Sequence, residues 1–150
     1  MIRPLLDGST IPILEKVAAF GERRHEVLAG NLANIDTPGY RMRDLPVAAF
    51  QKALAEATER LRSGQSIGTE ASASPASAGS ASPDLDHLFP PNLFRPSDAA
   101  SKNLTFQDGN NRSVEYEVME MTKNAMLQKY ALQVMIAQMN LLQSVIAERP

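Results

Sequence analysis

The side chains of this sequence that could carry out acid–base chemistry are few, and their spacing matches no common catalytic pattern. Asp36 and Asp44, together with Glu22 or Glu26 from the segment before them, could form a carboxylate pair in which one group donates a proton and the other accepts it. Carboxylates close to a helix end more commonly bind backbone N–H groups or stay solvated. We therefore expect these four side chains to be structural rather than catalytic.

Residues that usually bind metals or attack a substrate are also scarce. The two histidines, His25 and His87, lie far apart, and the sequence has no HExxH, GxxxxGKS/T or GxSxG motif. His25 falls on the apolar face of a predicted helix, where we expect an interface residue rather than a ligand. The absence of cysteine excludes disulfides, thiolate nucleophiles and cysteine-based zinc sites. The sequence thus predicts no enzyme, no metal site and no cofactor.

The most specific stretch, NLANIDTPGY at residues 31–40, has the chemistry of a backbone corner. Pro38 followed by Gly39 meets the requirements of a type II turn, and Thr37, which precedes proline, is disfavoured in a helix. A helix should therefore end near Asp36, where short polar side chains can bond the freed backbone groups. The alternative is a turn that ends the helix and contacts nothing. We define the corner motif as Asn31, Leu32, Asn34, Asp36, Thr37, Pro38, Gly39 and Tyr40.

The elements that must position this motif are helices. From Ile11 to about Ile35 the apolar residues recur every three or four positions, which predicts an amphipathic helix of about 23 residues. Pro12 suits its first turn, and Gly21 on the apolar stripe would allow another backbone to approach closely. A second, shorter helix is predicted from Asp44 to about residue 62.

The middle of the chain has a different composition. Residues 63–83 are almost entirely Ser, Ala, Gly and Pro, which predicts a linker or a disordered insertion. The following stretch to residue 107 contains several prolines and should be irregular. It could form a clip that packs through its apolar side chains, which are Leu88, Phe89, Leu93 and Phe94.

The C-terminal stretch gives the clearest helical signal. From Val114 the apolar residues alternate steps of four and three without a break, the spacing of a heptad seam in a coiled coil. Gln128 is a polar seam residue that could fix the register of the pairing. A second apolar series runs beside the seam through Met119, Met126, Tyr130, Val134, Leu141 and Val145, so we expect more than one neighbour and therefore other chains.

These patterns together predict an all-α fold, in which long N- and C-terminal helices pair as a coiled-coil-like axial core beside a short middle helix. The expected units are residues 1–36, 37–62, 63–107 and 108–150. The predicted helix seam consists of Leu14, Leu28, Ile35, Val118, Met121, Gln128, Leu132, Met135, Met139, Leu142 and Ile146.

Charge and hydropathy narrow the possible partners. The formal net charge of −2 gives no reason to expect nucleic acid or an anionic membrane as a partner. The N-terminal stretch lacks the apolar run and cleavage site of a secretory signal, so we expect no cleaved signal peptide. No stretch approaches about 18 uninterrupted apolar residues, so we also expect no direct membrane span.

Two segments resemble the flagellar axial protein family of rod, hook and hook-associated subunits. NLANIDTPGY, placed after a first helix, resembles the signature of that family. The stretch DGNNRSVEYEVMEMTKNAMLQKYALQVMIAQMNLLQSVIAERP is similar to the end of a proximal-rod subunit in its Asp-Gly-Asn lead-in, its Val-Glu entry, Asn124 and Tyr130. The resemblance covers residues 11–48 and 108–147, and the Ser/Ala-rich block has no counterpart in it.

The resemblance implies a structural rod subunit that transmits torque from motor to hook. It also implies export from the cytoplasm by the flagellar type III export apparatus and assembly in the periplasmic part of the basal body. The implied partners are copies of the chain, other rod subunits and the adaptor FliE. Alternatives are an FlgC-like rod subunit, a cytosolic coiled-coil adaptor or export chaperone, and a cell-wall hydrolase, for which the acid–base residues are missing.

Overall fold

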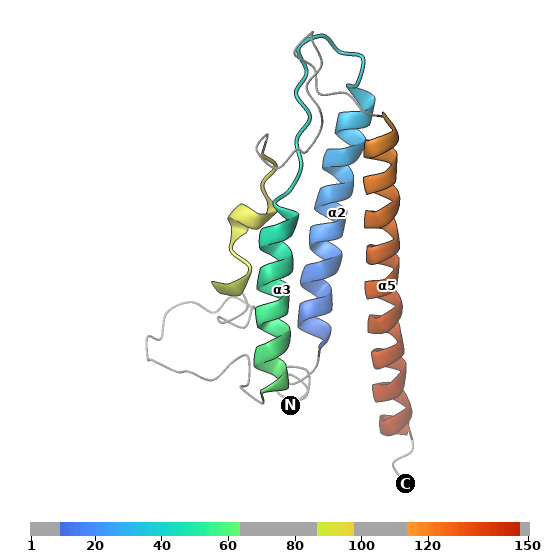
Figure 1. Ribbon diagram of the computed structural model, residues 1–150. Helices are drawn as coiled ribbons and strands as arrows, with labels where there is room; N and C mark the ends of the chain where they lie inside the picture. Colours follow the sequence, from blue (N-terminus) through green and yellow to red (C-terminus); the bar gives the residue numbers. More distant parts are fainter. Residues whose placement is uncertain (1–9, 64–86, 98–113, 148–150) are drawn as a thin grey trace, which may run out of the picture.

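The computed structural model describes residues 10–63, 87–97 and 114–147 (Figure 1). These residues form helices α2 (Ile11–Ala33), α3 (Val47–Arg62) and α5 (Val114–Ala147) and the 3-10 helix η1 (Pro91–Phe94). The extended pairing in these ranges is an isolated antiparallel bridge between Asp44 and Ser97. The predicted all-α class is confirmed. The predicted linker and most of residues 63–107 lie outside the described residues.

Helix α2 has a proline in its first turn and an asparagine at its C-terminal cap. Pro12 occupies its first turn, as predicted, and Thr10 stands at the N-cap without a side-chain bond to the helix. The helix ends at Ala33, three residues before the predicted end at Asp36, because Asn34 closes it. The carbonyl oxygen of Gly30 accepts both the backbone N–H of Asn34 at 3.2 Å and its side-chain amide at 2.8 Å, which closes the last turn.

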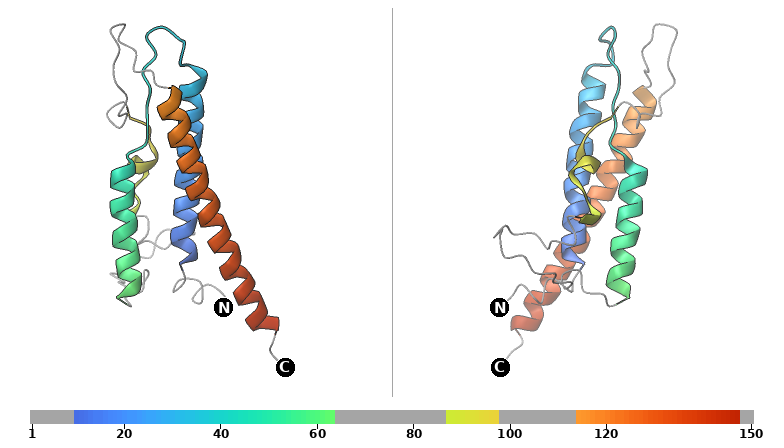
Figure 2. Two further views of the ribbon diagram at one scale, coloured as in Figure 1. Left: turned by 45° about the vertical axis from the view of Figure 1, so that its right-hand side comes forward. Right: turned by 90° about the vertical axis from the view of Figure 1, so that its left-hand side faces the viewer.

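Helix α2 lies between α3 and α5, and α5 runs antiparallel along it (Figure 1). From the end of α2 the chain passes through the corner motif and returns as an extended segment, residues 40–46, to the start of α3. Figure 2 shows that the C-terminal half of α5 slants away from α2 and extends past its first turn.

The hydrophobic core lies mainly between α2, α3 and η1. The rings of Phe20 in α2 and Phe50 in α3 stack with centroids 3.9 Å apart and an interplanar angle of 11°. Phe89 lies 5.4 Å from Phe50, and Phe94 lies 6.0 Å from Phe20, each measured between ring centroids. Such ring pairs add to the free energy of burial. The segment around η1 thus packs as the clip that its apolar side chains indicate, although its 3-10 helix was not expected.

The face that α2 buries follows the predicted helix seam only in part, since Leu28 is buried but Ile13 is buried in place of Leu14. The buried residues of α2 are Ile13, Val17, Phe20, Gly21, Arg24, Leu28 and Asn31. The apolar face of this helix is wide, so the sequence pattern alone could not decide which of its residues are buried. Leu28 of the predicted seam is buried, whereas Leu14 and Ile35 are partly exposed.

Helices α2 and α5 pair, but α5 does not use the predicted seam for this contact. Its buried residues are Glu117, Asn124 and Ala131, which are two polar residues and one small residue at heptad spacing. Among the predicted seam residues, Met121, Gln128, Met135 and Leu142 are half-buried, and those that lie exposed are Val118, Leu132, Met139 and Ile146. Whether the exposed seam contacts another chain stays a prediction.

The large hydrophobic side chains that are exposed in the described residues all belong to α5. By length and composition the helix could cross a membrane, and little of its most apolar part is buried inside the chain. The expectation that no segment is apolar enough was therefore too strict, because it required an uninterrupted apolar run. One such helix is weak evidence for a membrane span, since an interface helix of the same composition passes the same test.

Candidate assembly site

The turn at Pro38 and Gly39 has the predicted conformation. The N–H of Tyr40 donates to the carbonyl oxygen of Thr37 at 3.2 Å, which closes a four-residue turn. Gly39 has a φ of 76° at the third position, the value that a type II turn requires. The N–H of Thr37 in turn donates to the carbonyl oxygen of Asn34 at 3.0 Å. Two consecutive turns therefore reverse the chain at the end of α2.

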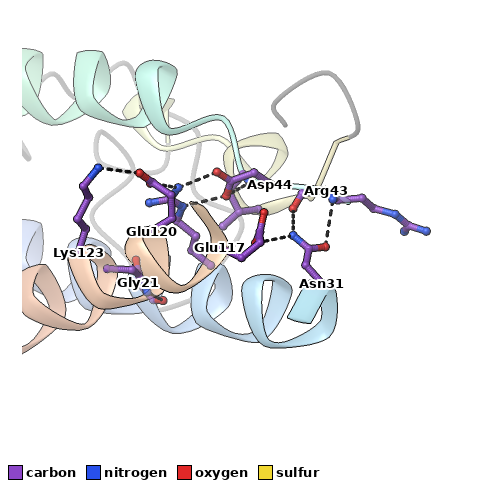
Figure 3. Close-up of polar contacts among 10 residues, drawn as sticks. Gly21, Asn31, Arg43, Asp44, Glu117, Glu120 and Lys123 are labelled. Atoms are coloured by element: carbon purple, nitrogen blue, oxygen red, sulfur yellow. Dashed lines mark hydrogen bonds and ion pairs between the residues drawn. The ribbon is translucent and has the colours of Figure 1, made fainter. Parts of the chain in front are cut away.

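Asn31 fastens the segment that leaves this turn. Its side chain is only 1% exposed, and its amide group donates to the Arg43 carbonyl oxygen at 2.7 Å and to Oε2 of Glu117 at 3.2 Å. Its Oδ1 accepts from the Arg43 N–H at 3.1 Å and from the Tyr40 hydroxyl at 3.2 Å. Figure 3 shows Asn31 between Arg43 and Glu117. One side chain thus binds both backbone groups of Arg43, as a neighbouring strand would.

Arg24 lies on the same face of α2 as Asn31, about two turns closer to the N-terminus. It binds the same segment through an ion pair. Its Nε and Nη2 donate to the two carboxylate oxygens of Asp44 at 2.9 and 2.7 Å, which makes a bidentate ion pair. The same Nη2 donates to Glu120 of α5 at 2.8 Å. Asp44 also accepts from the Leu45 N–H at 2.8 Å, and its backbone pairs with Ser97. Arg24 therefore joins α2, α5 and the segment before α3.

The protonation of these groups follows from their mutual contacts. Burial alone would lower the pKa of Arg24, but the hydrogen bonds and charges of Asp44 and Glu120 raise it above its ordinary value. Burial would raise the pKa of Glu120, but hydrogen bonds from Lys123 and Arg24, with their positive charges, lower it. Burial and the nearby carboxylates raise the pKa of Tyr116. These shifts of the pKa favour the protonated form of Arg24 and the ionised form of Glu120.

A third contact between α2 and α5 involves a glycine. The side-chain amide of Asn124, 2% exposed, donates to the carbonyl oxygen of Gly21 at 2.8 Å. A Cβ at Gly21 would lie 3.3 Å from Cγ of Gln128, so the missing side chain leaves room for Gln128. We call the three α5 residues Glu117, Glu120 and Asn124 the polar ladder. Their partners on α2 are Asn31, Arg24 and Gly21.

The residues of the corner motif differ in how far they are buried. Asn31 is buried, and Leu32, Asn34 and Tyr40 are half-buried. The tip of the corner is exposed and consists of Asp36, Thr37, Pro38 and Gly39. The motif contacts its own chain through Asn31 and Tyr40, so it is more than a turn that ends the helix.

The acid–base pair considered from the sequence is not assembled. Asp44 is bound by Arg24, whereas Glu22 and Glu26 are exposed on α2. His25 is also exposed, because the buried face of α2 passes through Arg24 instead, and an interface role for His25 with another chain stays a prediction. Within the described ranges, no group of three or more His, Asp or Glu side chains is arranged to hold a metal ion.

Sequence reasoning missed Arg24 and the polar ladder as contact residues within the chain. A signal was available in the spacing. Arg24 lies seven residues after Val17 and seven before Asn31, and Asn124 lies seven after Glu117, so each falls on a heptad position. A charged residue at such a position predicts a buried partner of opposite charge.

Comparison with known proteins yields two curated relatives. A flagellar basal body rod protein FlgB from Yersinia enterocolitica is 35% identical over 85 residues, which are 56% of this chain and 61% of that protein. A flagellar basal body rod protein FlgB from Aquifex aeolicus (strain VF5) is 51% identical over 35 residues, 23% of this chain and 28% of that protein. The chain thus spans less than two thirds of each relative's length.

Two other comparisons gave no match. No family model matches the sequence, and no solved structure is similar to it. The similarity to the two flagellar rod proteins confirms the resemblance that the corner motif and the C-terminal helix indicate.

Proposed function

We propose that the chain is a structural subunit of the bacterial flagellar rod. The observation that carries this proposal is the arrangement of α5, which turns polar and small residues toward its own chain and apolar residues outward. Solvated helices normally do the opposite. A helix of this kind gains the free energy of apolar burial only when other chains cover it. The similarity to proteins named as basal body rod proteins supports the same function.

The exposed residues of α5 fall into two stripes when they are placed at about 100° per residue. The first apolar face consists of Val114, Val118, Leu132, Ile136, Met139 and Ile146. The second apolar face consists of Met119, Met126, Leu127, Tyr130, Leu141 and Val145. A polar stripe separates them and contains Thr122, Lys129, Gln133 and Asn140. Two faces separated in this way fit neighbours on both sides, as in a wall of packed helices.

In the proposed function the subunit works mechanically. Torque passes from motor to hook through the helix contacts between subunits, and the corner motif holds the extended segment in one path at the end of α2. The subunit is exported from the cytoplasm by the flagellar type III export apparatus and assembles in the periplasmic rod. Its partners are copies of itself, other rod subunits and the adaptor FliE. Its role is structural rather than catalytic.

We call the statement that the corner motif fixes the path of the extended segment the corner hypothesis. It is tested in cells that depend on this chain for swimming. Replacing Pro38→Ala together with Gly39→Val should leave secretion intact and abolish most motility, because valine is strained at a φ of 76° and the corner loses its fixed path. The matched control is Gly30→Ala, in the last turn of α2 before the corner, where an added Cβ meets nothing within 4 Å. Normal motility of the double variant would contradict the corner hypothesis.

Fractionation distinguishes the rod subunit from the alternatives. A rod subunit, including an FlgC-like one, remains in purified basal bodies, whereas a cytosolic coiled-coil adaptor or export chaperone does not. Loss of swimming without detection of the chain in basal bodies would therefore count against the proposal.

A further inference from the structure

The apolar pattern of α5 does not by itself define how far α5 is shifted along α2. In the structure Glu120 lies against Arg24, Asn124 against Gly21, and Gln138 against Thr10. A shift of one heptad would bring Leu127 to Arg24, Ala131 to Gly21 and Val145 to Thr10. The shifted residues are small or apolar, so apolar contact would favour the shifted pairing at least as much as the observed one.

The polar ladder distinguishes the two pairings. In the shifted one Arg24, 7% exposed, would keep Asp44 but lose the carboxylate of Glu120, and the amide of Asn124 would lose the carbonyl of Gly21. Asn31, 1% exposed, would face Asn124 in place of Glu117. A buried polar group that loses its partner costs about 1–3 kcal/mol. The observed register is therefore the one in which these buried polar groups are satisfied.

We propose that the polar ladder specifies the register of α5 on α2. Glu117 and Glu120 also brace the segment after the corner through Asn31 and Arg24. Asn124 binds the backbone of α2 directly, at a residue without a side chain. Asn124 is therefore the residue of the polar ladder whose hydrogen bond to α2 does not involve a residue that also binds the segment after the corner.

The register has a consequence for assembly that rests on the proposed function. A shift of one heptad would move the two apolar faces of α5 by about 10 Å relative to α2 and the corner, at 1.5 Å per residue. Subunits with different registers would present their faces at different heights and could not pack into one regular wall. The ladder would thus select the form of the chain that can assemble.

The absence of cysteine makes the register measurable by disulfide formation in the full chain. Cysteines at Thr10 and Gln138 report the observed register, and cysteines at Thr10 and Val145 report the shifted one. With the ladder intact, the intrachain disulfide 10–138 should form at least about tenfold faster than 10–145, since one unsatisfied buried group already corresponds to such a ratio. Mass measurement without reductant separates intrachain from interchain products.

The ladder variant Glu120→Leu with Asn124→Leu should bring the two rates within about threefold while the chain keeps its helical circular dichroism. The matched control is Glu115→Leu with Asn140→Leu, the same residue types on exposed positions of α5, which should keep the preference for 10–138. A ladder variant that retains this preference would overturn the proposal. So would a ladder variant that loses its helicity, because the ladder would then be needed for pairing itself. Neither result bears on the rod function, which motility and fractionation test.

Discussion

At the scale of single residues, the corner depends on side chains that replace missing backbone partners. In the segment of residues 40–46, Asp44 pairs with the backbone of Ser97, whereas the N–H and the C=O of Arg43 bind the side chain of Asn31 as they would bind a strand. The sequence showed that Asn31 belongs to a specific motif at the end of the first helix. It could not show the partner, because Arg43 becomes adjacent only after the two turns reverse the chain.

Replacing Asn31→Ala should lower the free energy of unfolding by about 2–4 kcal/mol, because the backbone of Arg43 and the carboxylate of Glu117 lose buried hydrogen bonds. Urea unfolding followed by circular dichroism measures the change. Asn140→Ala, on an exposed position of α5, is the control and should change stability by less than about 0.5 kcal/mol. Equal effects of the two substitutions would show that Asn31 does not fasten the segment.

Stability should also depend on pH through Glu120. The pKa of this carboxyl is lowered in the folded chain from its ordinary value of 4.5 by Lys123 and Arg24, against the effect of burial. Its contribution to stability is therefore complete above pH 4.5 and is lost as the pH falls through the folded-state pKa. The urea midpoint should fall with acidification, and Glu120→Gln should make that fall shallower.

The control for this measurement is Glu56→Gln. Glu56 forms an i,i+4 pair with Arg60 on the surface of α3, where its side chain is 52% exposed. Exposed pairs of this kind contribute little to stability, so the acid dependence should remain that of the unchanged chain. A variant at Glu120 with the same acid dependence as the Glu56 variant would contradict the assigned role of the ion pair.

At the scale of the elements, helical periodicity predicted which segments form helices but not which faces of these helices contact each other. The starts of α2 and α5 and the existence of α3 follow from spacing and from proline positions. The segment Pro91–Phe94 remained unassigned, because its prolines fit many irregular conformations and its helix is held by tertiary contacts with Phe20 and Phe50. The buried face of α5 was missed because hydrophobicity marks the surface that other chains are proposed to cover.

Helix α3 should depend on the aromatic stack more than α5 does. Phe50→Ala removes the ring that stacks on Phe20 and should destabilise the docking of α3 by about 3–5 kcal/mol. Amide hydrogen exchange should then show lost protection in α3, while the N-terminal half of α5 keeps its protection through the polar ladder. Phe50→Leu is the graded control, with a smaller loss confined to α3. Equal loss of protection in α3 and α5 would mean that the two helices fold as one unit.

At the scale of the whole molecule, specific polar contacts and apolar surface are divided between two sides of α5. The polar ladder joins α5 to α2 inside the chain, and the two apolar faces point away from it. Buried polar contacts contribute more to specificity than to net stability, whereas apolar burial contributes most of the free energy of association. This division suits a chain that defines its own shape first and is stabilised by its neighbours afterwards.

Each apolar face of α5 should therefore be needed for assembly and not for the fold. Ile136→Lys on the first face and Leu141→Lys on the second replace side chains that are 59% and 66% exposed, so each should change the free energy of unfolding by less than about 0.5 kcal/mol. Each lysine would have to be buried without a partner when a neighbouring chain covers its face, and this penalty should prevent assembly.

Swimming in soft agar and recovery of the chain in basal bodies measure this effect, with secretion as the test of export. Gln133→Lys is the control, because Gln133 lies on the polar stripe between the two faces, and it should swim normally. If Ile136→Lys alone blocks swimming, only the first face contacts a neighbour, and the second remains open to solvent. If both lysine variants swim as the control does, neither face is covered in the rod, and the outward apolar side of α5 has no role in assembly.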